Sequence, residues 1–255
     1  MFDRQNYIKD DSPIKKTLLK LFKKTDKLIL FDVGACEGEE SIRYSKIFPF
    51  SSIYIFEPLP KNQIHIIENI SKYNFENLNL IPFAVSDEDG EAEFYVSSGH
   101  PENLSTDLDW DFGNKSSSLL SPEKSNNPSW LSFEEKIQVE TIKLASFSKK
   151  NEISEVDFMH MDVQGAELKV LKGANEFIKN IKAIWLEVSD IELYKNQPLR
   201  VDIEEFMVSN GFDLIKSELE GKVGDQFYLN KNYFKTISFF KRRFQFHIKK
   251  QNIKQ

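Results

Sequence analysis

Cysteine is almost absent from this sequence of 255 residues, since Cys36 is its only one. A single cysteine excludes an intramolecular disulfide and is typical of proteins from a reducing compartment. Long apolar runs are absent as well: no stretch approaches the roughly 20 apolar residues that a membrane-spanning helix requires. The N-terminal stretch MFDRQNYIKDDSPIKK lacks the apolar core of a signal peptide. We therefore expect a cytoplasmic protein.

Positive charge is scarce in most of the chain. The sequence has 34 Lys and Arg against 40 Asp and Glu, a net charge of −6, yet residues 231–255 contain eight Lys or Arg and no Asp or Glu. Residues 1–230 then carry a net charge of −14, because eight positive charges are removed from a total of −6. An acidic body of this kind argues against a nucleic-acid partner.

The C-terminal tail, residues 232–255, alternates aromatic and basic side chains in NYFKTISFFKRRFQFHIKK. This pattern predicts peripheral contact with an anionic membrane surface as an amphipathic helix, or docking onto an acidic partner. The alternative is a frayed and solvated tail.

Glycine is sparse too, at 10 residues, and the segments between the glycines follow a regular order. Apolar residues at helical spacing behind Ser12 and Pro13 predict a helix in the N-terminal segment, residues 1–27. After it the patterns predict strand, helix, strand, helix and strand at 27–34, 37–48, 51–58, 62–73 and 78–87. This order predicts a parallel sheet with crossover helices. Further strands are expected at 89–98, 136–144, 156–165, 181–189, 211–218 and 225–231, and a helix at 167–180.

Acidic residues stand where four of the predicted strands end: Asp32, Glu57, Asp162 and Glu187. Ligands of open parallel sheets bind outside the carboxyl ends of the strands, so these acids are expected to form one acidic rim. Such a rim suits a ligand with hydroxyl groups and positive charge, and it suits a phosphate poorly. The first turn also lacks the P-loop and dinucleotide glycine patterns. S-adenosylmethionine, which has no phosphate, is the remaining common ligand.

Five motifs in order carry a family resemblance: FDVGACEG, IYIFEP, PFAVSDEDG, SSSLL and MDVQGAELKVLKGA. With them the chain resembles class I S-adenosylmethionine-dependent methyltransferases, and among these the FkbM family, over roughly residues 28–190. The resemblance implies a doubly wound, Rossmann-like α/β fold whose seven-stranded sheet is mostly parallel with antiparallel closing strands. It also implies O-methylation, with a small-molecule or glycan acceptor and with sugar hydroxyls as a frequent acceptor class.

The resemblance further implies roles for residues at matching positions. Asp32 would lie near the ammonium of the cofactor, and the amides of the tight turn would meet its carboxylate. Glu57 would accept hydrogen bonds from the ribose hydroxyls, and Asp162 would face the transferred methyl group. The remaining cofactor positions are Gly34, Ala35, Cys36 and Gly38 in the turn, Ala84, Val85 and Ser86 beside the adenine, and Pro58. The chain departs from the family pattern at Cys36, Glu37, His160 and Gln164, where Asn, an apolar residue, Lys and Glu are common.

For catalysis, His160 is a candidate proton acceptor, with Asp162 or Glu187 orienting it, because a hydroxyl is a poor nucleophile. The alternative for His160 is a packed histidine of the sheet. Asp162 and Glu187 could instead hold Mg²⁺, which prefers oxygen ligands. Glu167 is expected either to reach the substrate or to favour the start of its helix. Two further alternatives are another small-molecule hydroxyl or carboxyl acceptor, and a non-catalytic scaffold that retains the fold.

The predicted organisation is an N-terminal segment (1–27), a methyltransferase domain (28–231) and the tail (232–255). Within the domain, residues 98–135 are rich in Ser, Asn, Pro and Asp and carry three aromatic candidates for an acceptor lid, His100, Trp110 and Trp130. A loop of this length is usually functional or mobile, and the alternative is a surface insertion without a role.

Overall fold

The structure is a computed structural model that describes residues 4–102, 104, 111–123 and 125–234. The expectations for Trp110, and those for the tail from residue 235 onward, lie outside the described residues.

A seven-stranded sheet forms the centre of the molecule, in the order β3-β2-β1-β7-β8-β10-β9. Neighbouring strands from β3 to β8 run parallel, and β10 is antiparallel to both β8 and β9. The predicted fold class is therefore confirmed. The strands are β1 (Ile29–Val33), β2 (Ser52–Phe56), β3 (Leu78–Ile81), β7 (Val156–Met161), β8 (Ile181–Ser189), β9 (Phe212–Glu220) and β10 (Val223–Asn230).

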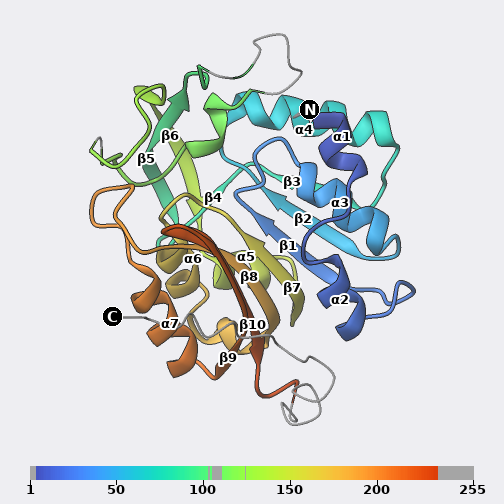
Figure 1. The fold of residues 1–255 in the computed structure, drawn as a ribbon. Coiled ribbons are helices and arrows are strands. Elements are labelled where there is room, and N and C mark those ends of the chain that lie inside the picture. The colour runs from blue at the N-terminus through green and yellow to red at the C-terminus, as the bar shows by residue number, and fades with distance from the viewer. Residues whose placement is uncertain (1–3, 103, 105–110, 124, 235–255) are drawn as a thin grey trace, which may run out of the picture.

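Helices cover both faces of this sheet (Figure 1). One face packs against α1 (Arg4–Lys9), α2 (Lys15–Leu21), α3 (Glu39–Ile47) and α4 (Pro60–Tyr73), and the other against α5 (Leu144–Lys150), α6 (Glu167–Gly173) and α7 (Arg200–Ser209). The helix expected at 167–180 divides into α6 and the 3₁₀ helix η2 (Asn175–Asn180), whose first residue, Asn175, has a positive φ of 48°.

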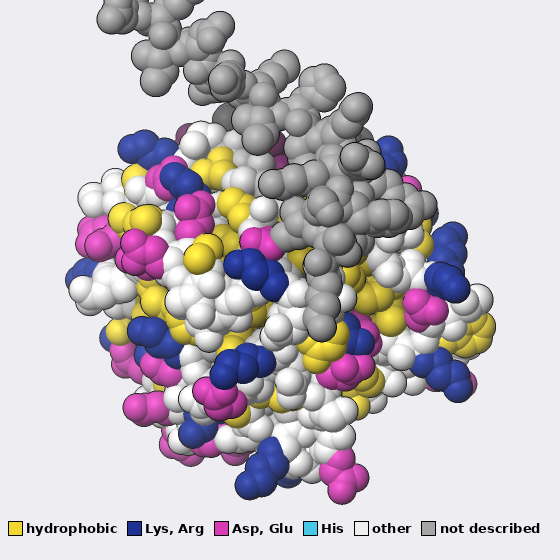
Figure 2. All heavy atoms as spheres, turned by 90° about the horizontal axis from the view of Figure 1, so that it is seen from below, with side chains coloured by type: hydrophobic (Ala, Val, Ile, Leu, Met, Phe, Trp, Pro, Cys, Tyr) yellow, Lys and Arg dark blue, Asp and Glu magenta, His cyan; other side chains and the backbone are white. Residues whose placement is uncertain are grey.

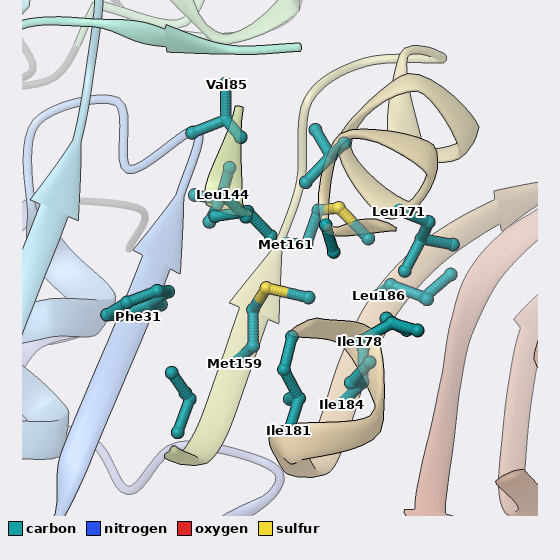
Figure 3. Close-up of a cluster of buried hydrophobic side chains, with 14 of the residues drawn as sticks. Phe31, Val85, Leu144, Met159, Met161, Leu171, Ile178, Ile181, Ile184 and Leu186 are labelled. Carbon is teal, nitrogen blue, oxygen red and sulfur yellow. The ribbon is translucent and has the colours of Figure 1, made fainter. Parts of the chain in front are cut away.

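The two faces bury separate apolar clusters because successive side chains of a strand point to opposite faces. Phe31, Met159 and Ile184 belong to the cluster under α5 and α6 (Figure 3). Leu30 and Phe158, one position before Phe31 and Met159, belong to the cluster under α2 and α3. The same alternation turns Asp32 and His160 toward α3, at the point where the apolar pattern gives way to polar residues.

A second sheet stands beside the carboxyl ends of the main strands and has the order β4-β6-β5. Its strands are β4 (Ala84–Val85), β5 (Gly90–Ser98) and β6 (Ser132–Ile142). The single strand expected at 78–87 is thus two strands in two sheets, and the break falls at Pro82, which has no amide to donate to a ladder. Between β5 and β6 the chain forms the 3₁₀ helix η1 (Gly113–Ser116).

The surface seen from below carries acidic and basic side chains interspersed with apolar ones (Figure 2). On that face the described residues therefore present no extended field of one sign. None of the described helices combines the length and the hydropathy that crossing a membrane would require.

Candidate active site

The turn after β1 lets two adjacent strands meet at the carboxyl edge of the sheet. Gly34 has a φ of +81°, and a Cβ at this position would overlap the carbonyl oxygen of Asp162. Glycine alone satisfies both conditions without strain. The predicted tight turn is present, and its first residue, Gly34, lies directly against the backbone of Asp162.

Every backbone amide from residue 34 to residue 38 donates to an acceptor within the protein. The five bonds are Gly34 N to Phe56 O at 3.0 Å, Ala35 N to Phe56 O at 3.2 Å, Cys36 N to Glu57 Oε2 at 2.9 Å, Glu37 N to Glu39 Oε2 at 3.2 Å and Gly38 N to Ala35 O at 2.8 Å. We expected these amides to meet a cofactor carboxylate. Such a carboxylate would either replace one of these acceptors or bind to another partner.

Asp32 and His160 form a buried pair at this edge. The register of β1 and β7 places them opposite each other, with His160 Nδ1 3.1 Å from Asp32 Oδ1, and the Ser41 hydroxyl donates to Asp32 Oδ2 at 2.5 Å. Burial lowers the pKa of the imidazole, but the hydrogen bond and charge of Asp32 outweigh burial and raise the pKa to about 9. His160 therefore carries a proton at neutral pH, and its hydrogen-bonded acid is Asp32 rather than the expected Asp162 or Glu187.

Glu57 is a buried carboxyl group after the end of β2. Its Oε1 accepts from the Leu59 amide and its Oε2 from the Cys36 amide, both at 2.9 Å. Burial raises the pKa of Glu57 to about 8, against the opposing effect of these two amides. The Asn62 side chain is a third donor to Glu57. Because the two carboxyl oxygens have four lone pairs in total, Glu57 retains the capacity to accept a further hydrogen bond from a ribose hydroxyl.

Two adjoining cavities lie over this edge. The first contains about 500 Å³ of space free of protein atoms, open solvent at its mouth included, and combines Glu57 with an apolar end. Its predicted lining residues are Gly34, Cys36, Glu57, Pro58, Ala84, Val85 and Asp162, and those not predicted include Asn62, Phe83, Phe94, Asn114, Lys115 and Leu119. Aromatic and aliphatic walls beside the Glu57 carboxyl group suit a nucleoside.

The second cavity, of about 900 Å³ by the same measure, has more charged residues in its walls. It is lined by the predicted Asp32, Gly34, Ala35, Cys36, His160 and Asp162, and also by Tyr7, Glu39, Glu40, Phe112 and Lys115. Gly34, Cys36, Lys115 and Asp162 line both cavities. Asp162 therefore stands at the junction, where the predicted reacting group would lie.

Three predicted residues line neither cavity: Gly38, Ser86 and Glu187. Gly38 is the N-cap of α3 in the left-handed conformation, and the Ser86 hydroxyl donates to Asp87 at 3.0 Å. Both residues therefore lie beside the cavities rather than in their walls. Cys36 is a turn residue at a φ of 52°, and burial raises the pKa of its thiol well above the usual value, so it is no nucleophile at neutral pH.

Three acids gather behind the junction. Asp162, Glu167 and Glu187 each offer an oxygen within 4.8 Å of the others, and burial raises the pKa of all three. Gln164 Nε2 donates to Asp162 at 2.6 Å and to Glu187 at 3.3 Å. Glu167 accepts from the amides of Val163 and Gly165, at 3.1 and 3.2 Å, and so holds the turn before α6.

Two short segments supply some of the lining residues that the sequence did not indicate. Tyr7 of α1 donates its hydroxyl to Glu40 at 2.6 Å, and Arg4 pairs with Glu37, so α1 is fastened to the start of α3. Phe112 and Lys115 come from the segment between β5 and β6. Of the expected lid aromatics, His100 and Trp130 line neither cavity.

Comparison with known proteins agrees with this geometry. The family model described as the methyltransferase FkbM domain matches residues 32–214. The chain belongs to the FkbM methyltransferase family. It is 30% identical over 214 residues, 83% of each chain, to the 2-O-methyltransferase NoeI of Sinorhizobium fredii (strain NBRC 101917 / NGR234).

A solved FkbM methyltransferase from Methylobacillus flagellatus KT shares the fold, with a TM-score of 0.51 and 13% identity. The match covers 89% of this chain and half of the length of that one. The family shows that this chain is an S-adenosylmethionine-dependent methyltransferase, and the residues present fit that cofactor. Glu57 would hold the ribose, the apolar end of the first cavity the adenine, and the second cavity the methionine moiety. The bound cofactor supplies an electrophilic methyl group on a sulfonium.

Proposed function

We propose that this protein transfers the methyl group to a hydroxyl oxygen of a sugar or glycan-linked acceptor. The acceptor would enter the second cavity beside the methionine moiety of the cofactor. Two observations support this substrate class. The relative NoeI is named a 2-O-methyltransferase. Tyr7 and Phe112 add two aromatic side chains to a cavity whose other lining residues are mostly charged, and such a mixture suits the apolar faces and hydroxyl edges of a sugar ring.

Asp162 is our proposed proton acceptor, and its position at the junction of the two cavities carries the proposal. The Asp162 carboxylate would accept the proton of the acceptor hydroxyl as this oxygen takes up the methyl group, which the bound cofactor would supply from its sulfonium. Burial raises the pKa of Asp162, which makes the carboxylate a better base. His160 is protonated at neutral pH and serves as the positive neighbour of Asp32 and Asp162.

The test is an assay with methyl-labelled S-adenosylmethionine against nucleotide sugars, free glycans, and other small hydroxyl and carboxyl compounds. We expect an O-methyl product from the sugars, and transfer confined to the other compounds would contradict the acceptor class. Asp162→Asn should lower kcat about 100-fold or more and leave the affinity for S-adenosylhomocysteine nearly unchanged. Asp87→Asn, at an acid outside both cavities, is the matched control. Full activity of Asp162→Asn would remove Asp162 as the base.

The acid cluster supports a second version of this mechanism, in which Mg²⁺ on Asp162 and Glu187 lowers the pKa of the acceptor hydroxyl. Assays after treatment with EDTA, with and without added Mg²⁺, separate the two versions. Loss of turnover that Mg²⁺ restores would favour the metal. Unchanged turnover would leave the carboxylate as the sole base.

A further inference from the structure

Acids dominate the walls of the two cavities. Asp32, Glu39 and Glu40 line the second cavity, Glu57 lines the first and Asp162 lines both. Such walls attract the ammonium and sulfonium of the cofactor and repel its carboxylate. The turn after β1 offers the carboxylate no amide without an acceptor, because all its amides from residue 34 to residue 38 donate within the protein.

Lys115 is the only Lys or Arg among the described residues that line either cavity, and it lines both. Its Nζ lies 3.3 Å from Glu39 Oε1, and its side chain is 29% exposed. An ammonium has three donors, and a cofactor carboxylate at this position would be one of its acceptors. Burial lowers the pKa of Lys115, but the nearby Cys36, Glu39 and Glu37 outweigh burial and raise it, so the side chain keeps its charge.

The position of Lys115 is fixed by its neighbour in η1. The Asn114 side-chain amide donates to Glu37 Oε1 and to Asn62 Oδ1, both at 2.9 Å. These two bonds connect η1 to the turn after β1 and to α4. Lys115 is thereby held over the start of α3, beside the space in which the methionine moiety would lie.

We propose that the Lys115 ammonium is the counter-ion of the cofactor carboxylate. The segment between β5 and β6 thus provides the positive charge that the turn in this chain does not. The inference rests on the cofactor of the family and is independent of the acceptor proposed above, because cofactor binding is measured with no acceptor present.

The test compares two ligands by calorimetric titration, S-adenosylhomocysteine and the same compound without its carboxylate, decarboxylated S-adenosylhomocysteine. The wild type should bind the first more tightly by about tenfold or more, as for a hydrogen bond between charged groups. Lys115→Met should abolish most of this preference by weakening binding of S-adenosylhomocysteine alone, and Lys115→Arg should restore part of it. Lys136→Met, on β6 and outside both cavities, should retain the full preference.

Three results would overturn the proposal. The first is that Lys115→Met weakens the binding of both ligands equally, which would show that Lys115 only supports the wall of the cavities. The second is a wild type that does not distinguish the ligands. The third is loss of the preference in His160→Gln with retention in Lys115→Met, which would assign the carboxylate to the imidazolium. A wild type that binds S-adenosylhomocysteine but methylates no sugar would refute only the proposed acceptor.

Discussion

His160 Nδ1 lies 3.1 Å from Asp32 Oδ1, across two adjacent parallel strands whose register sets the residues directly opposite each other. Both side chains are largely buried, at 15% and 2% exposure. The pair therefore has two roles. It lines the second cavity, and it holds β1 against β7 below the turn that follows β1.

The first prediction concerns stability. The folded-state pKa of His160 is about 9, above its usual 6.5, so folding favours the protonated imidazole. The stabilisation is fully present below about pH 6.5 and is lost as the pH rises through about 9. Denaturant unfolding of the wild type and His160→Gln should show a difference that shrinks over this interval. His65→Gln, on the outer surface of α4, is the control, and a difference independent of pH would contradict the ion pair.

The second prediction concerns the pH dependence of turnover. If Asp162 accepts the proton, kcat/KM should rise with pH as this carboxyl group loses its own proton. The same rise should then be present in His160→Gln. If the imidazole were the base, the wild-type rate would keep rising to about pH 9, the pKa of His160, and the variant would lose that rise. Steady-state kinetics from pH 5.5 to 9.5 distinguish the two cases.

The third prediction concerns cofactor binding by Glu57. Ribose hydroxyls donate to the ionised carboxyl group, whereas the free group has a pKa of about 8. Binding of S-adenosylhomocysteine should therefore release a proton at neutral pH and weaken as the pH falls below about 8. Calorimetry in buffers of different ionisation enthalpy measures the released proton. Glu57→Gln should bind more weakly and release none, and an unchanged affinity in this variant would refute the ribose role.

The fourth prediction separates strain from overlap at Gly34. Gly34→Ala should lower the free energy of unfolding by about 2 kcal/mol or more, since it adds a clash with Asp162 to left-handed strain. Gly221→Ala is a matched control, because Gly221 has a φ of +70° and an added Cβ there would meet none of the described atoms within 4 Å. The control should lose less stability and keep its cofactor affinity. Equal losses in both variants would show that contact with Asp162 is unimportant.

The sequence was sufficient for the alternation of strands and helices from β1 to β3 and for three of the four acids at strand ends. It predicted neither α5 nor α7, and Glu187 lies inside β8 and lines neither cavity. Strand periodicity locates the last residues of β1, β2 and β7, and a parallel sheet brings these ends to one edge. Asp32, Glu57 and Asp162 could therefore be placed beside a common ligand.

The remaining site residues depend on tertiary structure. Tyr7 lies in a helix of six residues and Lys115 in a 3₁₀ helix of four, both too short to show a periodic pattern. Lys115 directly precedes the SSSLL motif, and this adjacency was the one available clue. The partner of His160 was misjudged because the register between β1 and β7 joins residues 128 positions apart.

The most direct test of the account is calorimetric titration of the purified protein with S-adenosylhomocysteine at neutral pH. The two cavities predict binding at one site per chain with micromolar or tighter affinity, and a matching rise in thermal stability. No binding to correctly folded protein would contradict the assignment of these cavities to the cofactor.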